Sequence, residues 1–156
     1  MQATTMMARS TLLAAGFLAS APVLAADWVG SRTGEVHIIK ECSHYTGGPG
    51  SYCTITASNV AEIPAGSQVN YDQGGYVPAS GSYPGGLLDS NVVLAAGNGN
   101  AAIGRCTLDG ATNLGLCTFS DGTGNLAGFH ARVNVAPTTG VSYSWIGTYH
   151  FTEVGE

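Results

Sequence analysis

The chain has 156 residues, of which only 10% are charged, and five Lys and Arg stand against ten Asp and Glu. With 44% apolar residues, this composition is typical of one globular domain and excludes a disordered chain. The net charge of −5 and the lack of any Lys and Arg cluster argue against a nucleic-acid partner, because binding to a phosphate backbone depends on such clusters.

Residues 1–25 have the pattern of a secretory signal peptide. Arg9 precedes an apolar run over residues 11–24, and the small residue Ala25 marks the expected cleavage point. The run is shorter than the ~20 apolar residues that a membrane-spanning helix needs. We therefore predict a mature domain of residues 26–156 that is secreted or periplasmic and has no membrane partner once the signal is removed.

After the signal peptide, the chain contains a series of strand candidates in which apolar and polar residues alternate. Turn signals separate these segments. They cover residues 35–40, 52–57, 67–71, 87–95, 101–108, 115–120, 126–135 and 141–152. No segment has helical periodicity of useful length. About eight short strands in one domain predict an all-β fold, either an antiparallel sandwich or a closed barrel.

The four cysteines form two pairs with ten residues between their members, Cys42 with Cys53 and Cys106 with Cys117. Four cysteines allow three connectivities, and we expect local pairing because each pair flanks a turn-rich segment. Such disulfides across hairpins agree with export. The spacing is longer than that of zinc ligands, so we expect no metal, and nothing in the sequence points to a cofactor.

Pairing of Cys42 with Cys53 would also set the register of the first hairpin. It would place Lys40 opposite Ile55 and Ile38 opposite Ala57, with the apolar side chains on one face.

Alternation along the last two strands gathers aromatic side chains on one face. In a small barrel, such an inner face either fills the interior or lines a cavity for one small apolar ligand. The long irregular segment over residues 72–86 carries two tyrosines that would close over the mouth of the cavity, or it is only a connecting loop. The predicted ligand contacts are Phe129, Tyr143, Trp145, Tyr149, Phe151, Tyr76 and Tyr83.

Charged catalytic machinery is sparse in this sequence. His37, His130 and His150 fall on the polar faces of their strands, where solvated surface histidines are expected. Glu35 and His37 lie on one side of a strand and would act as an acid and a base only in a cleft. Catalytic residues therefore remain unknown from the sequence.

Residues 120–131, with the sequence SDGTGNLAGFHA, and residues 145–151, with WIGTYHF, resemble the allene oxide cyclase and dirigent barrels. In that family a glycine-rich turn opens a strand that leads to an aromatic closing strand. The resemblance covers residues 87–152, and the chain differs at Asp121, in place of the first glycine, and at Leu126, in place of the usual phenylalanine.

The resemblance implies a single closed antiparallel β-barrel of eight strands, often trimeric, that holds a hydrophobic molecule in its lumen. Such a protein acts as an isomerase or cyclase that steers cyclisation or coupling by confining conformers. We therefore expect a barrel that binds a small hydrophobic molecule. The alternative is a non-catalytic secreted interaction or inhibitor module, which would present the braced loops at residues 44–50 and 109–113.

Overall fold

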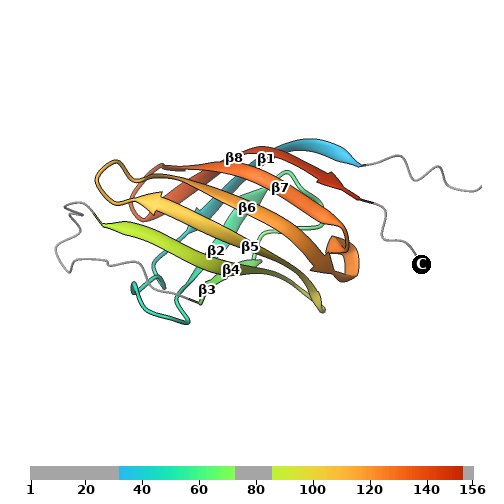
Figure 1. Cartoon of the computed structure of the whole chain (residues 1–156), viewed down its shortest axis with the longest axis horizontal. Helices are drawn as coiled ribbons and strands as arrows, with labels where there is room; N and C mark the ends of the chain where they lie inside the picture. Colours follow the sequence, from blue (N-terminus) through green and yellow to red (C-terminus); the bar gives the residue numbers. More distant parts are fainter. Residues whose placement is uncertain (1–31, 73–85, 153–156) are drawn as a thin grey trace, which may run out of the picture.

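The computed structural model describes residues 32–72 and 86–152, which form a closed barrel of eight antiparallel strands. Each strand pairs with the next along the chain, and the last pairs with the first (Figure 1). The all-β barrel prediction is therefore confirmed. The strands are β1 (Thr33–Glu41), β2 (Tyr52–Ser58), β3 (Gln68–Tyr71), β4 (Leu87–Gly97), β5 (Asn100–Asp109), β6 (Leu114–Thr123), β7 (Phe129–Pro137) and β8 (Ser142–Phe151).

Each predicted strand overlaps an observed one, and the clearest difference is at the start of β7. Residues 126–128 were expected to extend this strand, but a short 3-10 helix, Gly124–Leu126, precedes it instead. Gly128 then has a φ of 72°, in the left-handed region that favours glycine. A Cβ atom there would lie 2.2 Å from the backbone oxygen of Thr152, so the chain can turn into β7 only with glycine.

The register of the first hairpin is partly as predicted. Lys40 lies opposite Ile55, but Ile38 lies opposite Ser58 rather than Ala57. The difference arises because the register shifts between Ile39 and Lys40, where β2 contributes one extra residue as a β-bulge.

Both hairpin disulfides are present, as predicted. Cys42–Cys53 joins the end of β1 to β2, and Cys106–Cys117 joins directly opposed residues of β5 and β6. Both lie at the same end of the barrel, and Cys53, Cys106 and Cys117 are buried. We call this end, where β1, β3, β5 and β7 finish, the cystine end.

The opposite end of the barrel is closed by apolar side chains. Residues 59–67, between β2 and β3, bury Val60 and Ile63, and the 3-10 helix buries Leu126. Each of these side chains is at most 2% exposed. A ligand would therefore reach the interior from the cystine end.

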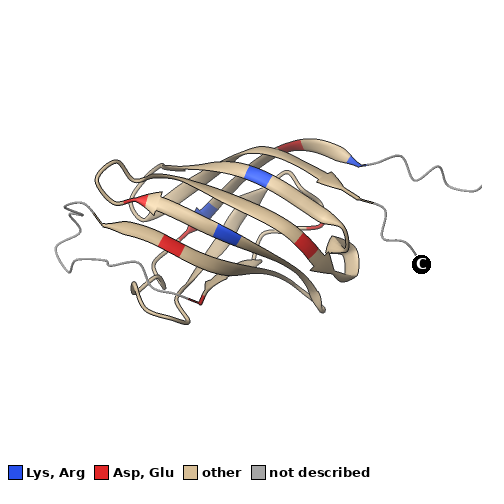
Figure 2. Cartoon of the chain, viewed as in Figure 1, with Lys and Arg blue, Asp and Glu red and all other residues tan. Residues whose placement is uncertain are grey.

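The charged residues are few and are spread over several strands and loops of the barrel (Figure 2). In residues 32–72 and 86–152, no helix has the length and apolar character needed to cross a membrane. The predicted signal peptide and the predicted contacts Tyr76 and Tyr83 lie outside the described residues.

Candidate functional site

The predicted aromatic face points into the barrel, as expected, but most of it packs against itself. The Phe129 ring lies 5.3 Å from Phe151 and 6.0 Å from Tyr149, measured between ring centroids. Trp145 lies 5.3 Å from Phe119. The void beside this cluster is only about 10 Å³, room for about one water molecule. This half of the interior is therefore filled by side chains.

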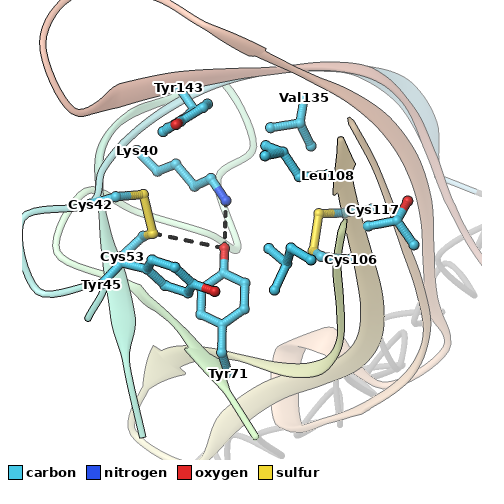
Figure 3. A pocket seen from close by; sticks show the side chains of 12 residues that line it. Lys40, Cys42, Tyr45, Cys53, Tyr71, Cys106, Leu108, Cys117, Val135 and Tyr143 are labelled. Atoms are coloured by element: carbon cyan, nitrogen blue, oxygen red, sulfur yellow. Dashed lines mark hydrogen bonds between the residues drawn. A yellow bond between two sulfur atoms is a disulfide. The ribbon is translucent and has the colours of Figure 1, made fainter. Parts of the chain in front are cut away.

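A larger cavity, of about 50 Å³, lies at the cystine end. Its walls include both disulfides and Tyr143, which is the one predicted contact among the described residues that lines it (Figure 3). Since a water molecule needs roughly 10–15 Å³ on this measure, the cavity has room for about four waters or a few heavy atoms of a ligand.

Apolar side chains from three strands make much of the wall. Leu88 comes from β4, Leu108 from β5 and Val135 from β7. They face the cavity because alternate residues of each strand point into the barrel. The cavity is therefore apolar apart from a small number of polar groups, which is the usual character of a small-molecule site.

The central polar group of the cavity is the amine of Lys40. This side chain is on the inner face of β1, in line with Val36 and Ile38, and is only 4% exposed. Its Nζ atom lies 2.7 Å from the hydroxyl oxygen of Tyr71 and 4.6 Å from the centroid of the Trp145 ring. Figure 3 shows the Lys40 amine and the Tyr71 hydroxyl meeting inside the cavity.

Burial controls the protonation of Lys40. In the described part of the chain, ion pairs join other residues, and no carboxylate lies within ion-pair distance of its amine. Burial therefore lowers the pKa of Lys40 from the ordinary lysine value to about 7. Close to neutral pH, both the ammonium and the free amine are populated.

Tyr71, at the end of β3, stays protonated under the same conditions. Burial raises the pKa of its phenol well above the usual range, and the nearby Tyr45 and Tyr143 raise it further. Its oxygen lies 3.8 Å from Cys53 Sγ, and in that contact only the phenol has a proton to donate. The hydroxyl can thus accept from the Lys40 ammonium while it donates to sulfur.

Sequence reasoning missed Lys40 and Tyr71 as site residues, although a signal was present. Lys40 shares the strand parity of Val36 and Ile38, and it is the single lysine of the whole sequence. Tyr71 has the parity of the buried Val69. This parity predicts that the side chains of Lys40 and Tyr71 lie inside the barrel. The general preference of lysine for the surface argued against an inward Lys40.

The histidines lie outside the barrel. His37 is exposed, with its Nε2 atom 3.2 Å from a carboxylate oxygen of Glu35, and this pair faces solvent rather than a cleft. His130 and His150 stack on neighbouring strands with ring centroids 4.9 Å apart. None of these side chains lines the cavity.

The two loops proposed for partner binding are both at the cystine end. In the first, the Ser51 hydroxyl donates to the Gly48 carbonyl over 2.6 Å. In the second, the Asp109 carboxylate accepts from the backbone N–H groups of Ala111 and Thr112. Internal hydrogen bonds therefore hold both tips.

No family model, curated protein or solved structure matches the chain. The resemblance to the allene oxide cyclase and dirigent barrels stays a prediction.

Proposed function

We propose that this barrel is an exported protein that binds a small hydrophobic molecule through the cavity at its cystine end. The observation that carries the proposal is the pairing of Lys40 and Tyr71 inside an otherwise apolar cavity. Apolar walls with a few convergent polar groups are what a small-molecule site requires, since the walls provide affinity and the polar groups fix orientation.

The size of the cavity restricts the ligand. A volume of about 50 Å³ accepts a compact molecule or one end of a longer one, whose remainder would extend through the mouth. The bound end would carry a polar atom for Lys40 or Tyr71, because a purely apolar end would leave both groups buried without a new partner.

Export is supported by the cysteines. Two disulfides are compatible with an oxidising compartment outside the cytoplasm, in agreement with the predicted signal peptide. Cyclisation or coupling of the ligand, and assembly into a trimer, are what the family resemblance implies, and both stay predictions.

Fluorescence of Trp145 tests the proposed binding. Replacing Trp28 with Phe leaves Trp145 as the one tryptophan of the sequence, and its ring lies close to the Lys40 amine. Titration of the Trp28→Phe protein with 1-hexanol should change the emission with saturation. A linear response, or none, would contradict binding at this site.

Two neighbouring residues supply a matched pair of variants for this titration. Leu88 lines the cavity, whereas Leu87 is 63% exposed on the outer face. In the Trp28→Phe background, Leu88→Phe should fill the cavity and weaken 1-hexanol binding, and Leu87→Phe should leave it unchanged. Equal effects of the two variants would place the ligand elsewhere.

The interaction module is the second candidate function, and the internal hydrogen bonds of the two tips favour it. A rigid tip loses little conformational freedom on binding a partner. If it is right, replacing residues 46–50 and 110–113 with glycine and serine, which keeps the cavity residue Tyr45, should abolish capture of a partner protein and leave the response to 1-hexanol unchanged.

A further inference from the structure

We propose that Lys40 is a nucleophile that forms a reversible imine with the carbonyl group of an aldehyde or ketone bound in the cavity. This inference rests on the proposed function and names the chemical class of its ligand. It depends on where the amine lies, on what surrounds it and on the hydroxyl beside it.

The position of Lys40 is unusual for a lysine. Lysine is rarely buried without an ionic partner, yet the one lysine of this sequence points into the lumen and is 4% exposed. Its amine ends at the cavity rather than in a packed wall (Figure 3). A carbonyl group that enters the cavity therefore meets this amine.

The surroundings of the amine favour its reactive form. Among the described residues, the other titratable groups that line the cavity are Tyr45, Tyr71 and Tyr143, and none of them is a carboxylate that would hold the ammonium. With a pKa of about 7, roughly half of the Lys40 amine is neutral at neutral pH. An ordinary exposed lysine is neutral only to about one part in three thousand. Lowering the pKa by burial is a known way to activate a lysine for attack on carbonyl groups.

The reaction needs no component beyond the ligand. The Lys40 nitrogen attacks the carbonyl carbon, a C–N bond forms, and one amine proton moves to the carbonyl oxygen to give a carbinolamine. The C–O bond then breaks as that hydroxyl gains a second proton and leaves as water, while the nitrogen lone pair forms the C=N bond. One water is released for each imine, nothing is oxidised or reduced, and addition of water reverses the reaction.

Tyr71 is placed to transfer the protons. Its hydroxyl lies 2.7 Å from Nζ and holds its proton firmly at neutral pH. It can donate that proton to the departing hydroxyl and regain one from the nitrogen, so that it ends unchanged. The Trp145 ring, 4.6 Å from Nζ, would stabilise a positively charged iminium by a cation–π interaction.

Reductive trapping tests the inference directly. The mature protein is incubated at neutral pH with a low concentration of hexanal and sodium cyanoborohydride, which reduces an imine to a stable amine. Intact mass and peptide mapping should show one added hexyl group, located on Lys40. The N-terminal amine is the other primary amine of the chain, and peptide mapping separates the two sites.

An exposed lysine provides the control. Arg132 is exposed on the outer face of β7, so Arg132→Lys adds an ordinary surface amine to the same protein. Trapping at Lys40 should be at least about tenfold faster than at position 132. Equal rates at the two positions would overturn the inference, because any exposed lysine would then serve as well.

Two variants separate the chemistry from simple binding. Lys40→Met should abolish the lumen adduct while circular dichroism shows that the barrel is retained. At a saturating concentration of hexanal, where a change in affinity does not affect the rate, Tyr71→Phe should slow trapping by roughly tenfold or more. In the unaltered protein, the rate should fall as the pH is lowered below about 7, where the Lys40 amine becomes protonated.

The outcomes distinguish the two proposals. If Trp145 fluorescence responds to 1-hexanol and hexanal but no adduct forms on Lys40, the imine proposal is wrong and the binding proposal stands. If neither compound changes the fluorescence and no adduct forms, both are wrong. Trapping at the N-terminal amine alone also overturns the imine proposal.

Discussion

The Nζ atom of Lys40 lies 4.6 Å from the centroid of the Trp145 ring, inside the barrel and between the cavity and the aromatic cluster. This distance is within the range of a cation–π interaction when the amine is protonated. The relationship makes Trp145 a reporter of the charge on Lys40. The contact also marks where the aromatic cluster, which fills one half of the interior, meets the cavity in the other half.

The first prediction is that Trp145 emission depends on pH with a midpoint near 7. Protonation puts a positive charge against the ring, and deprotonation removes it, so the emission should follow the Lys40 pKa of about 7. The measurement is a fluorescence titration of the Trp28→Phe protein between pH 5 and 9, at constant ionic strength. The same titration of the Trp28→Phe/Lys40→Met protein should be flat, and a midpoint that survives in it would assign the titration to another group.

The second prediction is that Lys40→Met stabilises the barrel at low pH. The folded state holds Lys40 with a pKa of about 7, whereas the unfolded chain has the ordinary lysine value. Between about pH 7 and pH 10 the unfolded state binds more protons, so the contribution of Lys40 to the free energy of unfolding rises with pH. Below pH 7 the buried ammonium carries its full cost, which is roughly 5 kcal/mol at most.

Urea unfolding of the two proteins at several pH values checks this. Lys40→Met should raise the free energy of unfolding by roughly 1–4 kcal/mol at pH 6, because an apolar side chain of similar length replaces a buried charge. The gain should shrink toward zero by about pH 10. A variant that is less stable than the parent at pH 6 would show that the Lys40 contacts with Tyr71 and Trp145 outweigh burial of the charge.

The strands, their faces and the disulfides could be predicted because they depend on local patterns. Alternation placed Phe129 and Trp145 inside, and cysteine spacing indicated the hairpins. No local pattern marks the bulge at Ile39 and Lys40. The predicted partner of Ile38 was therefore wrong by one residue. A one-residue bulge is decided by packing between strands, which a single sequence does not show.

The candidate site was harder to predict because a cavity is what all the side chains together leave empty. Whether the aromatic face fills the lumen depends on residues far away in the sequence, such as Ile63, which helps to close one end. The role of Lys40 was missed for a different reason. Its position in the alternating pattern of the strand predicted an inward side chain, whereas the energetic cost of burying an amine predicted an outward one. In the structure the side chain follows the alternation.

The third prediction concerns the Cys106–Cys117 disulfide. Its members are 11 residues apart in sequence, and closing a loop of this length in the unfolded chain stabilises the fold by about 2–3 kcal/mol. Cys106→Ala/Cys117→Ala should lower the free energy of unfolding by at least this amount, since the buried sulfur atoms also fill part of the lumen. Thr118→Ala, on the exposed face of the same strand, is the control. A loss no larger than that of the control in urea unfolding would contradict the prediction.

The fourth prediction separates the filled half of the lumen from the open half. Phe129 is 1% exposed and contacts three other aromatic rings, so Phe129→Ala should cost about 3–5 kcal/mol of unfolding free energy. Asn134→Ala, on the outer face of the same strand, should cost far less. Because Phe129 does not line the cavity, the affinity for 1-hexanol should stay unchanged while Leu88→Phe reduces it.

The comparison of Phe129→Ala with Leu88→Phe also tests the ligand contacts that were predicted from the sequence. If Phe129→Ala weakened 1-hexanol binding as strongly as Leu88→Phe does, at a temperature where both proteins are folded, the ligand would lie among Phe129, Tyr149 and Phe151. The aromatic cluster would then have to open to admit it, since the void beside the rings holds only about 10 Å³. An unchanged affinity would instead restrict the site to the cystine end, where Tyr143 lies beside Lys40 and Tyr71.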